Sequence, residues 1–311
     1  MTNRLNRRRF IHRTSLLAAG AVGLGALRAT PVQAIEPIAR DDLAAKFKFS
    51  LAAYSYRRLL KGKRPKMTLL EFMRDCAAMG LEGTELTSYY FPPKLTTEYL
   101  LDVKQAAFRL GLTISGTAVA NDFCNPDKRK RAADIAKVKQ WVDHAATLGA
   151  PVIRIFSGRV YKGQTAREAR NRCIEAIEAC CEYSGRRGVY LALENHGGLS
   201  VPVDSLLSIV QAVKSPWFGV NLDTGNFHSA TIYEDLAKAA PYAINVQVKA
   251  AVRGPDRKRV KSDYGRVAKI LRVAGYRGFV VAEYEEKGDP RVECPKMIDA
   301  MRKAFGSERP L

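Results

Sequence analysis

The chain has 311 residues, 47% of them hydrophobic, and a formal net charge of +20 at neutral pH. A chain of this length can bury a complete core in one domain and needs no second domain to do so. Its six cysteines form no C-x-x-C pair, so a zinc knuckle or a disulfide scaffold is unsupported. We expect these cysteines to be small buried hydrophobic side chains.

The first 34 residues have the features of an export leader. They contain six arginines and no acidic residue, and Asn6–Ile11 (NRRRFI) resembles a twin-arginine signal. A weakly apolar stretch, Ser15–Leu27, and a small-residue cleavage site at Val32–Ala34 follow. We expect residues 1–34 to be a removed signal peptide and 35–311 the mature protein, in the periplasm or otherwise exported. The alternative is a leader retained as an anchor.

No segment is expected to remain as a stable membrane span after cleavage. The apolar part of the leader is shorter than the ~20 residues that a spanning helix requires, and three glycines interrupt it. Twin-arginine substrates as a class cross the membrane already folded, often with a cofactor in place. A metal site loaded before export would suit such a route.

After the leader, predicted strands and helices alternate. The first five strands are expected at Phe47–Tyr56, Leu81–Thr87, Leu112–Ala120, Pro151–Phe156 and Val189–Glu194, and the last three in Phe218–Asn226, Ala243–Lys249 and Phe279–Glu285. The helices between and after them are expected at Leu69–Met79, Glu98–Leu110, Ala132–Leu148, Thr165–Arg187, Val203–Val213, Ile232–Ala240, Tyr264–Ala274 and Pro290–Phe305.

Eight strand-helix units in this length predict an α/β fold, a single-domain (β/α)8 TIM barrel with parallel strands. Glycines end five of the helices, which is the position where a left-handed residue is favoured. An open doubly wound sheet is the weaker alternative. The first strand is followed by Ser55–Arg58 and not by a G-x-G-x-x-G loop, so a dinucleotide enzyme is disfavoured.

Four consecutive predicted strands end in groups that can act as ligands: Glu194, Asp223, Gln247 and Glu283. The carboxyl ends of barrel strands form the usual site, so we expect these side chains to meet there. Three carboxylates in a partly dehydrated pocket would repel unless a cation neutralised them. Oxygen-rich ligation favours Mn²⁺ or Mg²⁺ over Co²⁺ or Zn²⁺. In the alternative, Asp223 caps a turn and Glu283 pairs with a surface arginine.

The segments LALENHGG, GVNLDTGN, VQVKA and VAEYE resemble the xylose isomerase-like TIM barrel superfamily, which includes sugar isomerases and ketose 3-epimerases. The resemblance covers essentially the whole mature chain. It implies a divalent ion held by Glu194, Asp223, Gln247 and Glu283. The family often has histidine where this chain has Gln247, and glutamine is a weaker ligand that cannot act as an imidazole base.

The chemistry that the resemblance implies is removal of a proton next to a sugar carbonyl, through an enediolate. Glu194 and Glu283 are the expected catalytic carboxylates. Lys249 lies on the same side of its strand as Gln247 and could stabilise an oxyanion. His196, Asn226, Glu85 and Tyr54 are the expected substrate contacts. The alternative is packing for His196 and Tyr54, and a surface or capping role for Glu85. Loss of a β-leaving group would instead make the protein a lyase or dehydratase.

A nucleic-acid enzyme of the endonuclease IV branch is the second class that the basic charge raises. That branch uses a histidine-rich three-zinc cluster, whereas only His144, His196 and His228 follow the leader. We therefore expect no nucleic-acid partner, and a sugar or sugar derivative as the ligand. The basic segments Lys128–Arg131 and Arg253–Lys261 are expected to be solvated loops or to attract an anionic polysaccharide or phosphate. A sugar-binding barrel without turnover and an oligomer are further possibilities.

Overall fold

The computed structural model describes residues 36–306, except for 39, 41–43, 63 and 257. The leader and its cleavage site lie outside the described residues. The barrel strands are β1 (Lys46–Ala52), β2 (Gly83–Thr87), β3 (Thr113–Ala118), β4 (Val152–Ile155), β5 (Tyr190–Glu194), β6 (Phe218–Asp223), β7 (Ala243–Lys249) and β10 (Arg277–Glu283).

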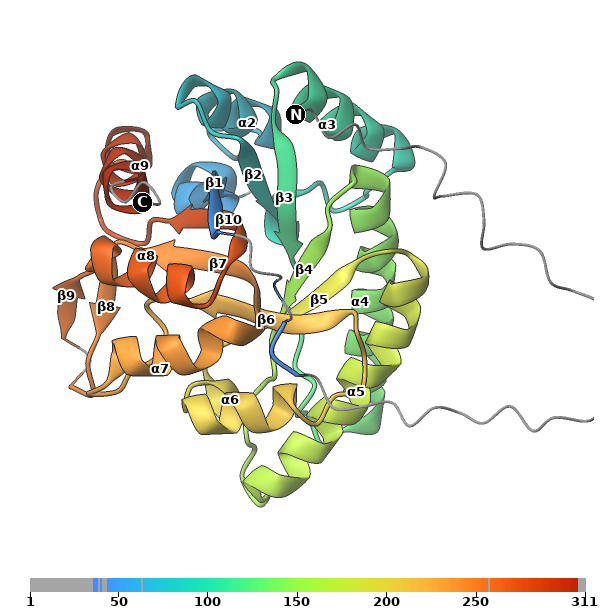
Figure 1. Cartoon of the computed structure of the whole chain (residues 1–311). Coiled ribbons are helices and arrows are strands. Elements are labelled where there is room, and N and C mark those ends of the chain that lie inside the picture. The colour runs from blue at the N-terminus through green and yellow to red at the C-terminus, as the bar shows by residue number, and fades with distance from the viewer. Residues whose placement is uncertain (1–35, 39, 41–43, 63, 257, 307–311) are drawn as a thin grey trace, which may run out of the picture. The chain divides into compact units, whose positions relative to one another are not determined.

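These eight strands form a closed barrel in the order β1-β10-β7-β6-β5-β4-β3-β2, and every neighbouring pair is parallel. The helices lie around the outside of the strands (Figure 1). They are α1 (Arg57–Leu60), α2 (Leu69–Ala78), α3 (Thr97–Arg109), α4 (Lys128–Leu148), α5 (Ala166–Arg186), α6 (Val203–Val210), α7 (Ile232–Ala239), α8 (Tyr264–Val273) and α9 (Pro290–Gly306). The predicted (β/α)8 barrel is therefore confirmed.

Local sequence signals explain where the helices begin and end. Thr68 and Thr165 each form a capping box with the glutamate three residues later, which starts α2 and α5. Helix α4 begins at Lys128, four residues before the predicted start, because the Asp127 side chain accepts hydrogen bonds from the backbone amides of Arg129 and Lys130. It ends at Gly149, whose φ of 79° is the left-handed conformation expected there.

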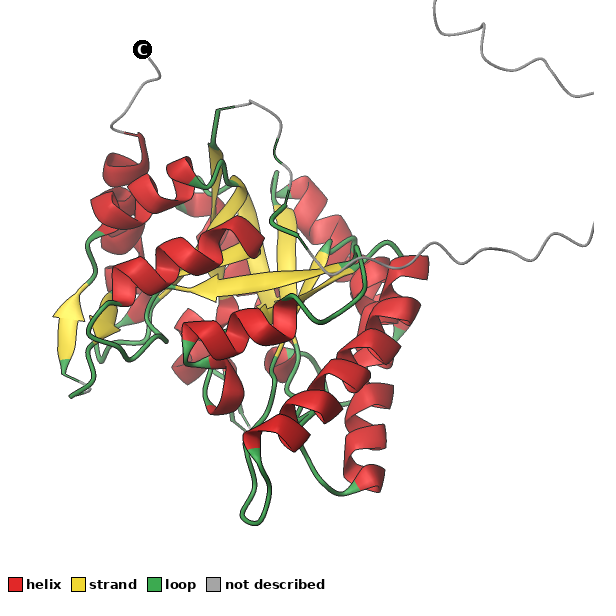
Figure 2. Cartoon of the chain, turned by 60° about the horizontal axis from the view of Figure 1, so that its bottom comes forward, coloured by secondary structure: helices red, strands yellow, loops and turns green. Residues whose placement is uncertain are grey.

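A hairpin that the sequence analysis expected to be a loop follows β7. Strand β8 (Ala251–Arg253) pairs antiparallel with β9 (Arg259–Lys261). The hairpin projects at the edge of the molecule beside α8 (Figures 1 and 2). Strand β9 reads Arg-Val-Lys and is exposed along its length, whereas β8 reads Ala-Val-Arg and its central valine is buried. The hairpin is therefore a solvated element, as predicted, but an ordered one.

The core lies mainly between the strands and the helices, where buried apolar side chains such as Phe72, Leu100 and Ile177 pack. All six cysteines are buried and unpaired, which confirms the expectation that they serve as small core residues. No helix of the described residues is long and apolar enough to cross a membrane.

Burial should make the cysteines unreactive, because it keeps a reagent away from the thiols and raises the pKa of Cys180 and Cys294 to about 12. We expect a thiol reagent to label none of the six within minutes in native buffer and all six in guanidinium. The exposed variant Val273→Cys, at a position 83% exposed, should react at once and serves as the control. Rapid labelling of a native cysteine would contradict this packing.

Candidate functional site

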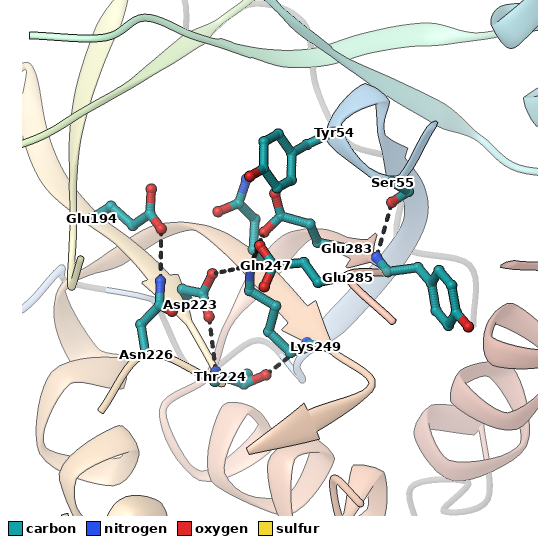
Figure 3. Close-up of polar contacts among 12 residues, drawn as sticks. Tyr54, Ser55, Glu194, Asp223, Thr224, Asn226, Gln247, Lys249, Glu283 and Glu285 are labelled. Atoms are coloured by element: carbon teal, nitrogen blue, oxygen red, sulfur yellow. Dashed lines mark hydrogen bonds and ion pairs between the residues drawn. The ribbon is translucent and has the colours of Figure 1, made fainter. Parts of the chain in front are cut away.

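Four charged side chains occupy the last positions of four neighbouring strands. Glu194 ends β5, Asp223 ends β6, Lys249 ends β7 and Glu283 ends β10. All four are buried, and Figure 3 shows them gathered in one region. The closed parallel barrel thus brings the predicted carboxylates to the same end, together with a lysine.

The Lys249 ammonium lies among three carboxylates. Its Nζ atom is 2.5 Å from Glu283 Oε2, 3.1 Å from Asp223 Oδ2 and 2.9 Å from Glu285 Oε1. Burial by itself would lower the pKa of Lys249, but Asp223 and Glu283 raise it well above its usual value. The side chain therefore carries a full positive charge at neutral pH.

Glu194 has a positively charged partner of its own. Arg154 Nε, from the middle of β4, lies 2.9 Å from Glu194 Oε2, and Asn226 Nδ2 donates to Oε1 at 2.9 Å. Burial raises the pKa of Glu194 to about 7, while Arg154 opposes that rise. A carboxyl group with such a pKa can take up and release a proton near neutral pH.

A closed ring of hydrogen bonds links four more side chains inside the barrel. Asn245 Nδ2 donates to Glu85 Oε2 at 2.8 Å and to Asn221 Oδ1 at 2.7 Å. Asn221 Nδ2 donates to Gln247 Oε1 at 2.7 Å, and Gln247 Nε2 donates to Glu85 Oε1 at 2.6 Å. Both Glu85 oxygens accept in this arrangement, and the orientation of every amide in the ring follows from that, while burial raises the pKa of Glu85 to about 7. The side-chain oxygen and nitrogen of Gln247 are therefore both hydrogen-bonded.

The residues present do not fit the predicted divalent ion. The Gln247 oxygen is held by Asn221, the Glu194 oxygens by Arg154 and Asn226, and Lys249 lies between Asp223 and Glu283. Within the part of the chain that the structure describes, no group of three or more His, Cys, Asp or Glu side chains is placed to hold a metal ion. The predicted set of four thus shares one end of the barrel, where other side chains contact its oxygens.

The predicted substrate contacts occupy different places. Tyr54 is half-buried and lies beside Glu283 and Glu285 (Figure 3), and Asn226 binds Glu194 as described. The exposed His196 ring packs against Phe156 with centroids 4.6 Å apart and ring planes inclined by 37°. Glu85, also expected as a substrate contact, is held inside the barrel by the amide ring and is only 1% exposed.

Two residues of the site were not selected from the sequence. Arg154 is the only charged residue in its predicted strand, Pro151–Phe156, and a charge within a buried strand is a usable signal. Glu285 lies two positions after Glu283, so strand periodicity places both on the same side. The hairpin also contributes, since Arg253 and Arg259 line a small hollow together with Asn226, Lys249, Glu283 and Glu285.

Removing the ammonium should destabilise the fold, because it leaves buried carboxylates without their counter-charge. We expect Lys249→Met to lower the free energy of unfolding by ~3–5 kcal/mol in metal-free buffer, measured by urea denaturation. The matched control Lys296→Met breaks an exposed pair with Glu293 and should change it by less than ~1 kcal/mol. Equal effects of the two substitutions would contradict the charge arrangement described above.

Comparisons with known proteins agree on the fold. No curated protein matches the sequence. The D-psicose 3-epimerase structure with D-tagatose from Clostridium cellulolyticum H10 is similar to this chain, with a TM-score of 0.70 at 15% identity over 83% of this chain and 99% of that one. An L-ribulose 3-epimerase gives 0.69 at 17% identity, over 84% and 95%. The 3-keto-D-glucoside 4-epimerase of E. coli gives 0.66 at 14% identity, over 83% and 99%.

At these identities the structural likeness establishes the fold alone. The model of the family described as xylose isomerase-like TIM barrel matches residues 73–304, which is most of the chain and includes every barrel strand from β2 to β10. The resemblance found in the strand ends is thereby confirmed at the level of the family. The chain belongs to the xylose isomerase-like TIM barrel family.

Proposed function

We propose that this protein is a sugar isomerase or epimerase that removes a proton from a carbon next to a carbonyl. The observation that carries the proposal is the convergence of Glu194, Glu283 and Lys249 at one end of the barrel. Carboxylates can act as bases, and a fixed ammonium can stabilise the oxyanion that forms when the proton leaves. The names of the similar structures, which are epimerases of free sugars and of a keto-glucoside, support the same class.

In the proposed reaction, one carboxylate takes the proton and the carbonyl oxygen gains negative charge as the enediolate forms. Lys249 donates a hydrogen bond to that oxygen. Glu194, held in place by Arg154 and Asn226, is one candidate base, and Glu283 is the other. Figure 3 shows these two carboxylates extending from opposite sides of the cluster. Return of the proton to the opposite face of the same carbon gives an epimer, and return to the neighbouring carbon gives an isomer.

Aromatic and polar side chains around the carboxylates suit a sugar ring. Tyr54 lies over Glu283 and Glu285 and could offer one face of its ring to the sugar. The exposed His196 ring, which packs at an angle against Phe156, offers a second flat surface and a hydrogen-bonding group. The free hydroxyls of the substrate would then be bound around the carbon that loses its proton.

A lyase acting on a keto-sugar would use the same first step. If the enediolate carries a leaving group on the next carbon, loss of that group competes with return of the proton. Analysis of the products therefore distinguishes a lyase from an isomerase or epimerase.

Export remains part of the proposal, on the strength of residues 1–34 alone. A twin-arginine leader would send the folded barrel to the periplasm, where free sugars and glycosides are more available than sugar phosphates. We expect N-terminal sequencing of the protein recovered from the exported fraction to begin after Ala34. An intact leader on the exported protein would support the anchor instead.

Proton exchange tests the proposed reaction directly. Purified protein should exchange a substrate carbon-bound proton with D₂O for at least one keto-sugar or 3-keto-glycoside, detected by NMR and mass spectrometry. Glu194→Gln and Glu283→Gln should each lower the exchange rate by about 10²–10⁴-fold, because each removes a base or its positioning. The matched control Glu234→Gln alters an exposed ion pair with Arg266 and should leave the rate unchanged.

Sugar binding without any exchange would contradict the proposed function. It would indicate a binding protein that keeps the fold of the family. Exchange that is unaffected by both Glu194→Gln and Glu283→Gln would place the chemistry elsewhere in the protein.

A further inference from the structure

We propose that Lys249 is the permanent cation of this site and that the pocket consequently binds no divalent metal ion. The inference deepens the proposed function and rests on it only for the catalytic role of the lysine. The absence of metal binding follows from the contacts of the described residues and does not depend on that function.

The ammonium lies among three carboxylates. Lys249 Nζ donates a hydrogen bond to Glu283 Oε2 at 2.5 Å and forms ion pairs with Glu285 Oε1 at 2.9 Å and Asp223 Oδ2 at 3.1 Å. A divalent ion bound to these oxygens would lie next to the ammonium and repel it. The two cations therefore compete for one place, and the lysine is covalently fixed there.

The fold holds the lysine from its backbone to its side-chain stem. The Lys249 backbone amide donates to Thr224 Oγ1 at 2.9 Å, within the turn that follows β6. The aliphatic stem crosses Gly225 so closely that a Cβ atom at Gly225 would lie 2.6 Å from Lys249 Cγ. The turn thus lacks a side chain at the point where the lysine passes. The position of the Lys249 side chain is therefore set by β7, which carries it, and by the turn that follows the neighbouring strand β6.

The remaining predicted ligands are not available to an ion. Gln247 would have to break two buried hydrogen bonds of the amide ring to turn its oxygen toward the carboxylates. Glu194 would have to give up Arg154, which is itself buried and would be left without its charged partner. A metal ion bound by the predicted residues would therefore disrupt the ion pairs of Lys249, the hydrogen bonds of Gln247 and the ion pair of Glu194.

The arrangement also gives the lysine a way to reach a substrate. Glu285 is its most exposed partner, with a side chain 30% exposed, whereas those of Asp223 and Glu283 are 0% and 9% exposed. A substrate oxygen can replace Glu285 beside Nζ while Asp223 and Glu283 continue to hold the ammonium. Lys249 would then donate to the carbonyl oxygen at the step where negative charge develops there.

Metal titration tests the proposal on the full mature protein. After treatment with EDTA and desalting, wild-type protein is titrated with Mn²⁺ by calorimetry, and bound Mn²⁺ is counted by elemental analysis. We expect no binding at micromolar Mn²⁺ and no change in the melting temperature in millimolar Mn²⁺. One Mn²⁺ bound per chain at micromolar concentration would overturn the proposal, and this measurement needs no variant to fold.

A substitution should reverse the behaviour. Lys249→Ala removes the ammonium, so that Asp223, Glu283 and Glu285, which are not placed to hold an ion in the wild-type arrangement, become free to close around a hydrated one. We expect this variant to bind one Mn²⁺ per chain and to gain about 5–10 °C in melting temperature from saturating Mn²⁺. The control Lys296→Ala should respond like the wild type. A folded Lys249→Ala variant that gains no affinity for Mn²⁺ would overturn the idea that the ammonium excludes the ion.

The proton-exchange assay separates this inference from the proposed function. Exchange that proceeds equally in EDTA and in Mn²⁺ supports both. Exchange that requires Mn²⁺ overturns the inference and leaves the function standing. If wild-type protein neither binds Mn²⁺ nor exchanges protons under any condition, the proposed function fails and the metal-free pocket stands.

Discussion

Buried carboxylates at one end of a closed barrel need positive charge, and the rest of the site follows from how this chain supplies it. Lys249 forms ion pairs with Asp223, Glu283 and Glu285, and Arg154 forms one with Glu194. Both cations come from strands of the barrel, so the backbone fixes their positions. The carboxylates stay buried and close to one another because these charges make their crowding tolerable.

The amide ring lies in the barrel interior and determines what Gln247 can do. Glu85, Asn221, Asn245 and Gln247 satisfy one another's hydrogen bonds, so polar side chains fill a space that most barrels fill with apolar ones. Such a network is stable only if every member is satisfied. Gln247 is thus a structural member of the barrel, and its replacement of the family's histidine agrees with a site organised around Lys249.

The sequence was sufficient to predict the barrel because its signals are local and repeated. Strand ends such as Glu194 and helix ends such as Gly149 mark each strand-helix unit, and parallel closure then brings the strand ends together. The pairing of each carboxylate oxygen with a particular cation depends on distances between strands. No local sequence pattern contains those distances. The ring around Glu85 needs side chains from three strands, and the contact of Lys249 with Asp223 needs the free space at Gly225. Arg154 and Glu285 were visible as charges in or after apolar strands, but their partners were not.

A lysine ammonium lies where the family resemblance implied a divalent ion, and anomalous X-ray scattering from crystals grown with millimolar Mn²⁺ tests this most directly. We predict no anomalous peak among Asp223, Glu283 and Glu285, with the Lys249 side chain in ordered density between them. A strong peak there, about 2.0–2.3 Å from the carboxylate oxygens and with Lys249 displaced, would contradict the account.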